Sequence, residues 1–189
     1  VPATTEKDRQ RVQQELGLED QGVVVTEGFS QWILEDNFCA GRPAWEEVGV
    51  TMVDDVTPFE HMKLRMLNGT HSTLAYLGFI AGHEFVADAA NDSDFQQLLL
   101  GMWQDEIIPT LSMPVGIDLE SYAHDLMARY QNPELHHRLY QIAMDGSQKL
   151  PQRLLGTLRD HLTANRLPKR ILLAIAGWMR YVTGIEENG

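Results

Sequence analysis

From Pro58 onward the sequence is a series of amphipathic segments, each bounded by a capping residue, a proline or a glycine. These signals predict helices over residues 58–82, 92–108, 118–130, 133–144, 150–164 and 168–183. Helices with one apolar face bury that face by packing against one another. The pattern therefore predicts a mainly α fold, in the form of a helical bundle.

The residues before Pro58 show a different pattern. A short helix is predicted over residues 5–16, with Thr4 or Thr5 as its cap and Gly17 at its end. Strand candidates follow at residues 23–26 and 48–53. We expect a small β element near the N-terminus, and one interpretation is that it forms the edge of a sheet completed elsewhere.

The charge of the chain restricts its partners. The formal net charge is -12, whereas a sequence-independent nucleic-acid binder or an anionic-membrane binder needs a basic face. A small anionic substrate remains compatible, because one local lysine or arginine can hold a carboxylate. The single cysteine, Cys39, cannot form an intramolecular disulfide, and no signal peptide or membrane-spanning run is visible. We expect a cytoplasmic protein.

The length and the two ends of the sequence indicate how many domains the chain contains. A chain of 189 residues suits one substantial domain and is too short for two of ordinary size. We therefore expect a single helical domain over residues 1–189. The sequence starts at Val1 rather than methionine and stops soon after the last predicted helix, so we expect a fragment of a longer protein.

The predicted helix 58–82 carries an unusual set of polar residues. At about 100° per residue, Glu60, Lys63 and His71 share one face, and Asn68 flanks it. Partial burial of this face would lower the pKa of Lys63 and make its amine a usable base. Asn68 and His71 could then donate hydrogen bonds to a hydroxyl or carbonyl oxygen as charge develops on it.

The same spacing has a structural interpretation, which spacing alone favours. Glu60 and Lys63 could form an exposed ion pair, and His71 could be a hydrogen-bonded core histidine. Gly69 inside the helix costs stability relative to alanine, so it indicates a close backbone approach or a local bend.

A second candidate group lies at residues 145–149, between two predicted helices. Lys149 could hold a carboxylate or hydroxyl groups of a ligand, or it could be a solvated charge beside a helix stop at Asp145. The histidines show no metal-ligand spacing, and no glycine-rich nucleotide-binding motif occurs. We expect no metal site and no nucleotide-binding fingerprint.

The spacing of Lys63, Asn68 and His71 resembles the signature of the polyol-specific long-chain dehydrogenase/reductase family, also called the mannitol dehydrogenase family. Further similar segments, spread over the chain, are Thr26–Phe38, Gly41–Trp45, Asp54–Pro58 and Tyr76–Gly78. The resemblance implies two domains in the whole protein, an N-terminal Rossmann domain that binds NAD and a helical C-terminal domain. This chain is similar to the C-terminal domain alone.

The resemblance also implies roles for individual residues. Lys63 is the general acid/base, and Asn68 and His71 polarise or hold the reacting oxygen. Lys149 contacts the substrate, and Glu60 tunes Lys63 or relays its proton. The absent N-terminal domain supplies most of the NAD site, and hydride passes directly between substrate and nicotinamide, without a metal.

The resemblance also implies a particular substrate. Residues 141–153 and 176–181 are most similar to family members that interconvert D-mannonate and D-fructuronate. Gln141, a candidate substrate contact, stands where mannitol-oxidising members tend to carry arginine. Alternatives within the family are altronate and mannitol oxidation, and a non-enzymatic alternative is an isolated helical domain without activity. The sequence leaves the oligomeric state open.

Overall fold

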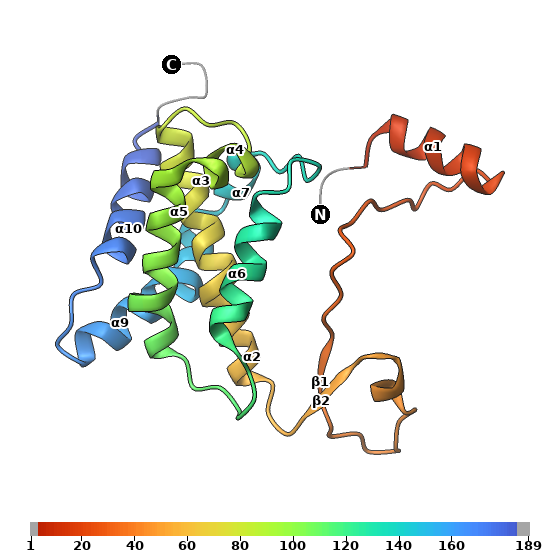
Figure 1. Ribbon diagram of the computed structural model, residues 1–189, viewed down its shortest axis with the longest axis horizontal. Helices are drawn as coiled ribbons and strands as arrows, with labels where there is room; N and C mark the ends of the chain where they lie inside the picture. The colour runs from red at the N-terminus through yellow and green to blue at the C-terminus, as the bar shows by residue number, and fades with distance from the viewer. Residues whose placement is uncertain (1–3, 185–189) are drawn as a thin grey trace.

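The computed structural model describes residues 4–184, and its main body is a bundle of helices that begins at residue 57 (Figure 1). The α-helices of this bundle are α2 (Thr57–Met62), α3 (Thr70–Ile80), α4 (Val86–Asn91), α5 (Ser93–Gly101), α6 (Leu119–Tyr130), α7 (Leu139–Ala143), α8 (Gly146–Leu150), α9 (Gly156–Thr163) and α10 (Lys169–Tyr181). Helix α3 lies at the centre, in contact with α4, α7 and α10. The predicted fold class, mainly helical with a small β element, is confirmed.

Three stretches of π-helix continue α-helices of the bundle. They are η2 (Lys63–Gly69), η3 (Met102–Ile107) and η5 (Pro151–Leu155). Two short 3-10 helices, η1 (Trp45–Val48) and η4 (Ile108–Thr110), complete the helical elements among the described residues. The predicted helix 58–82 is therefore one rod of three pieces, α2, η2 and α3.

The core lies where α3 meets its neighbours. Seven of the eleven residues of α3 are buried, and Trp103 and Tyr76 are the largest fully buried side chains. Tyr76 donates from its hydroxyl to the carbonyl oxygen of Ala143, which ties α3 to the end of α7 (3.1 Å). Burying a polar tip together with its partner in this way avoids the cost of an unpaired group.

Residues 4–53, which we call the N-terminal arm, lie beside the bundle (Figure 1). Helix α1 (Glu6–Leu16) begins at a capping box formed by Thr5 and Asp8 and ends at Gly17 in the left-handed conformation, as predicted. None of its residues is buried. Strands β1 (Ile33–Glu35) and β2 (Thr51–Val53) pair in parallel. The predicted strand 23–26 is wrong, because that segment has no ladder partner among the described residues.

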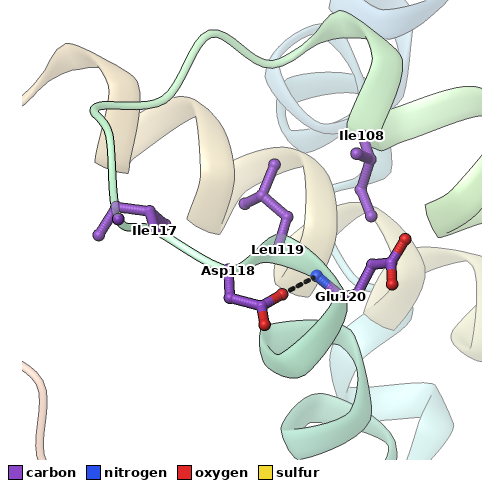
Figure 2. Close-up of a pocket in the computed structure, with 6 residues that line it drawn as sticks. Ile108, Ile117, Asp118, Leu119 and Glu120 are labelled. Carbon is purple, nitrogen blue, oxygen red and sulfur yellow. Dashed lines mark hydrogen bonds between the residues drawn. The ribbon is translucent and has the colours of Figure 1, made fainter.

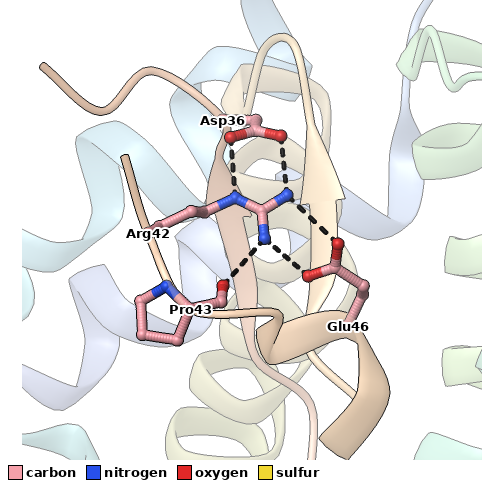
Figure 3. A network of polar contacts seen from close by, with 4 residues as sticks. All are labelled: Asp36, Arg42, Pro43 and Glu46. Carbon is pink, nitrogen blue, oxygen red and sulfur yellow. Dashed lines mark hydrogen bonds and ion pairs between the residues drawn. The ribbon is translucent and has the colours of Figure 1, made fainter. Parts of the chain in front are cut away.

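Arg42 holds the loop between the two strands (Figure 3). Its guanidinium donates to both carboxylate oxygens of Asp36 (2.8 Å each), to Glu46 and to the carbonyl oxygen of Pro43. These hydrogen bonds lower the pKa of the Asp36 and Glu46 carboxyl groups. One planar cation thereby connects the end of β1 to η1.

Several predicted helix boundaries need correction. The predicted helix 133–144 is α-helical only over α7, because residue Arg138 instead forms an antiparallel bridge with Phe85. The backbone bonds on either side of that bridge join His137 and Leu139 to residues 84–86, and they hold Arg138 in an extended conformation just before α7 begins. The predicted helix 150–164 begins earlier, at Gly146, and α4 was not predicted. Among the described residues, no helix is long and apolar enough to cross a membrane.

Candidate functional site

The π-helical segment η2 changes how the polar residues of the central rod are placed. In a π-helix, backbone hydrogen bonds join residues five apart instead of four. Lys63 and Asn68 are five apart, so η2 places them about one turn from each other on the same side. In a regular α-helix Asn68 would lie about 140° away from Lys63. His71 follows three residues later, in the first turn of α3.

The carbonyl oxygens of η2 accept hydrogen bonds from side chains of three other helical segments. The indole of Trp103 donates to the carbonyl oxygen of Met66 (2.9 Å), and the hydroxyl of Tyr130 donates to that of Leu67 (2.7 Å). The carbonyl oxygen of Gly69 accepts from Thr73 (3.0 Å). A π-helix leaves backbone groups without regular α-helical partners, and these buried donors satisfy them. The irregular segment is therefore held by the core.

Gly69 lies where η2 meets η5. A Cβ atom at this position would lie 2.7 Å from the carbonyl oxygen of Arg153, closer than real Cβ atoms approach a backbone oxygen. Only glycine fits without a shift of one backbone. Of the two sequence interpretations of Gly69, the structure therefore supports the close backbone approach.

His71 lies in a partly buried aromatic environment. Its ring stacks on Tyr130 with 5.2 Å between centroids, and the ring of His137 lies 6.0 Å away. The pKa of His71 is lowered to about 3. Burial is the largest cause, because it disfavours the charged imidazolium, and repulsion from His137 and Arg153 lowers the pKa further. The imidazole is therefore neutral near pH 7, so one ring nitrogen is a donor and the other an acceptor.

A cavity of about 300 Å³ opens beside His71. Its wall combines polar and apolar side chains from η2, α3, α4, α6, the segment between α6 and α7, and the N-terminal arm. They are Glu27, Leu67, His71, Val86, Arg129, Tyr130, Leu135 and His137. The volume is at the lower end of the range for small-molecule pockets.

Arg129 and Glu27 form an ion pair in this wall. The guanidinium donates through Nε and Nη2 to the two carboxylate oxygens of Glu27 (2.9 and 2.6 Å), and it lies 4.0 Å above the ring centre of Phe29. The sequence did not predict this pair, because its members are 102 residues apart and only the tertiary fold brings them together.

Lys63 differs from its predicted environment. Its side chain is exposed, so the expectation that this face is partly buried is wrong for Lys63 in the described structure. Glu60 is also exposed, and no ion pair joins it to Lys63 within residues 4–184. Asn68 is half-buried. The rod thus carries Lys63, Asn68 and His71 on consecutive turns, but of these three only His71 lines the cavity.

The second predicted group lies apart from this cavity. The ammonium of Lys149 donates to the carbonyl oxygen of Met144 (2.6 Å) and lies 3.8 Å from the Asp145 carboxylate. Asp145 has a φ of 57°, in the left-handed region that suits a helix stop. Gln141 is exposed on α7. Neither Lys149 nor Gln141 lines the cavity beside His71.

Another surface cavity has a structural explanation. It lies at the start of α6, where Ile108, Ile117 and Leu119 provide apolar walls (Figure 2). Of the two acidic residues there, Asp118 caps α6, because its carboxylate accepts from the backbone N–H of Glu120 (3.0 Å). Among the described residues, no group of three or more His, Cys, Asp and Glu side chains is placed to hold a metal ion.

The chain is similar to known proteins along its whole length. Residues 55–189 match the model of the mannitol dehydrogenase C-terminal domain. The chain is 50% identical to the D-mannonate oxidoreductase of Escherichia coli over 189 residues, which is all of this chain and 39% of that protein. It is 40% identical to mannitol dehydrogenase 2 of Saccharomyces cerevisiae, again over the whole chain and 38% of the relative.

Solved structures agree with these relatives. The chain superposes on the mannitol 2-dehydrogenase of Pseudomonas fluorescens, in its ternary complex with NAD and D-mannitol, with a TM-score of 0.88 and 40% identity. The TM-score is 0.89, at 36% identity, for a substrate-free D-sorbitol dehydrogenase. All of this chain is covered in both cases, but only 38% and 39% of the solved chains. The chain therefore spans about two fifths of the length of its relatives.

Proposed function

Since this chain belongs to the mannitol dehydrogenase C-terminal domain family, we propose that it is the substrate-binding and catalytic part of a longer NAD-dependent dehydrogenase. Its substrate is a sugar acid or a polyol, oxidised at a CH–OH group. The observation that carries this proposal is the placement of Lys63, Asn68 and His71 on consecutive turns of one rod, in a chain that matches dehydrogenases along its whole length.

The proposed chemistry assigns one proton and two hydrogen bonds to these residues. The amine of Lys63 takes the hydroxyl proton of the substrate during oxidation and returns it during reduction. Asn68 and neutral His71 donate hydrogen bonds to the same oxygen, which stabilise the charge that develops there. Glu60, exposed three residues before Lys63, relays the proton to solvent. Lys149 and Gln141 are proposed substrate contacts.

The NAD site lies, in this proposal, in the part of the relatives' length that this chain does not match. Residues 4–184 do not fit a dinucleotide, because neither three-residue strand is followed by a glycine-rich turn that opens a helix. Bound NAD supplies the hydride acceptor. The residues of this chain position the substrate and move its proton.

We propose D-mannonate and D-fructuronate as the substrate pair. Support comes from the 50% identity to the D-mannonate oxidoreductase. The family resemblance adds Gln141, since it implies arginine at this position in mannitol-oxidising members. A second candidate is the mannitol and fructose pair. It is favoured by the 40% identity to mannitol dehydrogenase 2 and by the relative solved with D-mannitol.

The substrate is tested by steady-state kinetics of the full-length protein with NADH. We expect the kcat/KM for D-fructuronate to exceed that for D-fructose at least about tenfold, because one well-placed polar contact contributes about that factor. Equal or higher kcat/KM for D-fructose would replace the mannonate proposal with the mannitol proposal. Absence of turnover with both ketoses, in protein that binds NADH, would overturn both.

A further inference from the structure

We propose that Arg153 binds the carboxylate of a sugar-acid substrate, which makes it a residue that determines specificity for acids over polyols. This inference rests on the proposed dehydrogenase function and adds a substrate class to it. Arg153 belongs to η5, which packs against the rod of α2, η2 and α3 that carries the proposed catalytic residues.

Arg153 is an exception among the half-buried arginines of residues 4–184. It forms no ion pair with any described carboxylate, although the chain has 27 acidic residues and only 15 lysines and arginines. Burial lowers the pKa of Arg153, because the guanidinium loses hydration that no nearby anion replaces. The other half-buried arginines all pair with a carboxylate, and they are Arg9, Arg42, Arg65, Arg129 and Arg170.

The free edge of the Arg153 guanidinium suits a carboxylate. Its Nη1 atom donates to the hydroxyl oxygen of Ser72 (3.0 Å), a buried residue of α3, and this hydrogen bond holds the planar group in place. Its Nε and Nη2 atoms have no hydrogen-bond partner among the described residues, and both reach solvent. These two atoms form one edge with parallel N–H bonds, which a carboxylate accepts in bidentate geometry.

Arg153 lies alongside the proposed catalytic residues. Its backbone carbonyl oxygen lies against Gly69, and its guanidinium reaches Ser72. Ser72 follows Asn68 by four residues, so it lies about 6 Å further along the rod on nearly the same side. Lys63, Asn68 and Ser72 therefore occupy successive turns of that side. A substrate whose reacting oxygen is held by Lys63 and Asn68 can extend its other end toward Arg153.

Lys149, one turn before Arg153, is the neighbouring cation. Its ammonium already donates to the carbonyl oxygen of Met144 (2.6 Å) and lies 3.8 Å from the carboxylate of Asp145. Arg153 has no such acidic neighbour, so an incoming carboxylate gains more by binding Arg153. In D-fructuronate the ketone and the carboxylate lie near opposite ends of the carbon chain. D-Fructose has a neutral hydroxymethyl group in place of the carboxylate.

The test compares Arg153→Met and Arg170→Met in the full-length protein, by KM for D-fructuronate and for D-fructose. We expect Arg153→Met to raise KM for D-fructuronate about 10- to 100-fold, because hydrogen bonds between two charged groups are lost, and to change KM for D-fructose no more than about twofold. Arg170 is the matched control, since it is also half-buried but pairs with Asp105 (2.8 Å). Arg170→Met should leave the ratio of the two KM values within about twofold.

A structural role, in which Arg153 only joins η5 to α3 through Ser72, is the competing explanation. Such a role would raise both KM values alike, because the carboxylate would not matter. Equal increases, a KM for D-fructuronate within twofold of wild type, or wild-type turnover of D-fructose alone would overturn the inference.

The NADH dissociation constant and the thermal midpoint establish that each variant is folded. If Arg153→Met does not fold, Arg153→Lys decides the question, since it keeps the charge but loses the planar fork. Its KM should then rise about three- to tenfold for D-fructuronate and stay unchanged for D-fructose. An equal change for both ketoses would contradict carboxylate binding.

Failure of the proposed function is separable from failure of this inference. If wild-type protein turns over neither ketose, calorimetric binding of D-mannonate and D-mannitol replaces the kinetic readout. Weaker D-mannonate binding by Arg153→Met, with D-mannitol binding unchanged, would still support carboxylate recognition. An equal loss of affinity for both, an unchanged affinity for D-mannonate, or no D-mannonate binding by the wild type would refute it.

Discussion

The environment of His71 sets what this residue can do. Stacked on Tyr130 and close to His137, its imidazole stays neutral because burial lowers its pKa to about 3. A neutral ring cannot act as a strong acid near pH 7, but it can donate one hydrogen bond to a substrate oxygen. This is consistent with Lys63, and not His71, being the proposed acid/base.

The pKa of His71 predicts a pH dependence of stability. Between about pH 3 and the unfolded pKa of about 6.5, the unfolded chain binds a proton at this position that the folded chain does not. The free energy of unfolding should therefore fall as the pH decreases through this window. We expect His71 to contribute about 1–2 kcal/mol of the loss between pH 7 and pH 5, after allowance for its partial exposure.

Urea unfolding of the chain and of His71→Asn at both pH values checks this prediction. The variant should lose about 1–2 kcal/mol less stability than the wild type on acidification. An identical loss in the two proteins would show that His71 titrates normally in the folded state.

At the residue scale, the expected partial burial of the helix face holds for His71 but not for Lys63. Periodicity places a residue on a helix face, but it does not say whether another element covers that face. Lys63 is exposed because nothing within residues 4–184 packs over it. Arg129 and Glu27 carried no local signal at all, since their pairing depends on the fold.

At the scale of elements, η2 is the feature that most affects the site. The helices α1, α6 and α10 were predicted within a few residues because caps such as Thr5 and Asp118 are local signals. The change from α to π between Lys63 and Gly69 has no such signal. It depends on donors such as Trp103 and Tyr130, which come from distant parts of the chain.

Alanine substitutions at Gly69 and Gly156 should change the free energy of unfolding in opposite directions, because only Gly69 lies in the close contact between η2 and η5. Gly69→Ala should destabilise the chain by about 1–3 kcal/mol, because the new methyl group would lie 2.7 Å from the carbonyl oxygen of Arg153. Gly156→Ala is the matched control, since its nearest neighbour would be Arg65 at 3.6 Å, an ordinary contact. It should stabilise the chain by about 0.5–1 kcal/mol.

Urea unfolding of both variants at pH 7 measures these changes. Equal stability of Gly69→Ala and wild type would mean that the two helices do not approach as closely as described.

At the scale of the whole molecule, the chain combines a helical bundle with an N-terminal arm that buries little of its own surface. The family model begins at residue 55, close to the point where the bundle begins. The resemblance to the mannitol dehydrogenase family, first seen in the Lys63, Asn68 and His71 spacing, is confirmed by the comparisons. The division into domains, the cytoplasmic location and the individual residue roles stay predictions.

The proposed location of the NAD site predicts how the chain behaves alone. Because residues 4–184 contain no dinucleotide-binding turn, the 189-residue chain should bind NADH with a dissociation constant no tighter than about 1 mM. The full-length protein should bind it far more tightly. Fluorescence titration with NADH compares the two, and tight binding by the chain alone would contradict the proposed location.

The central claim, that Lys63 transfers the proton of the reacting hydroxyl group, is tested most directly by Lys63→Ala in the full-length protein. The measurement is kcat for oxidation of the preferred substrate, together with the NADH dissociation constant. We predict a loss of about 100- to 10,000-fold in kcat, the usual contribution of a general base, with NADH affinity nearly unchanged. A kcat within a few-fold of the wild-type value would contradict the assignment of Lys63 as the acid/base.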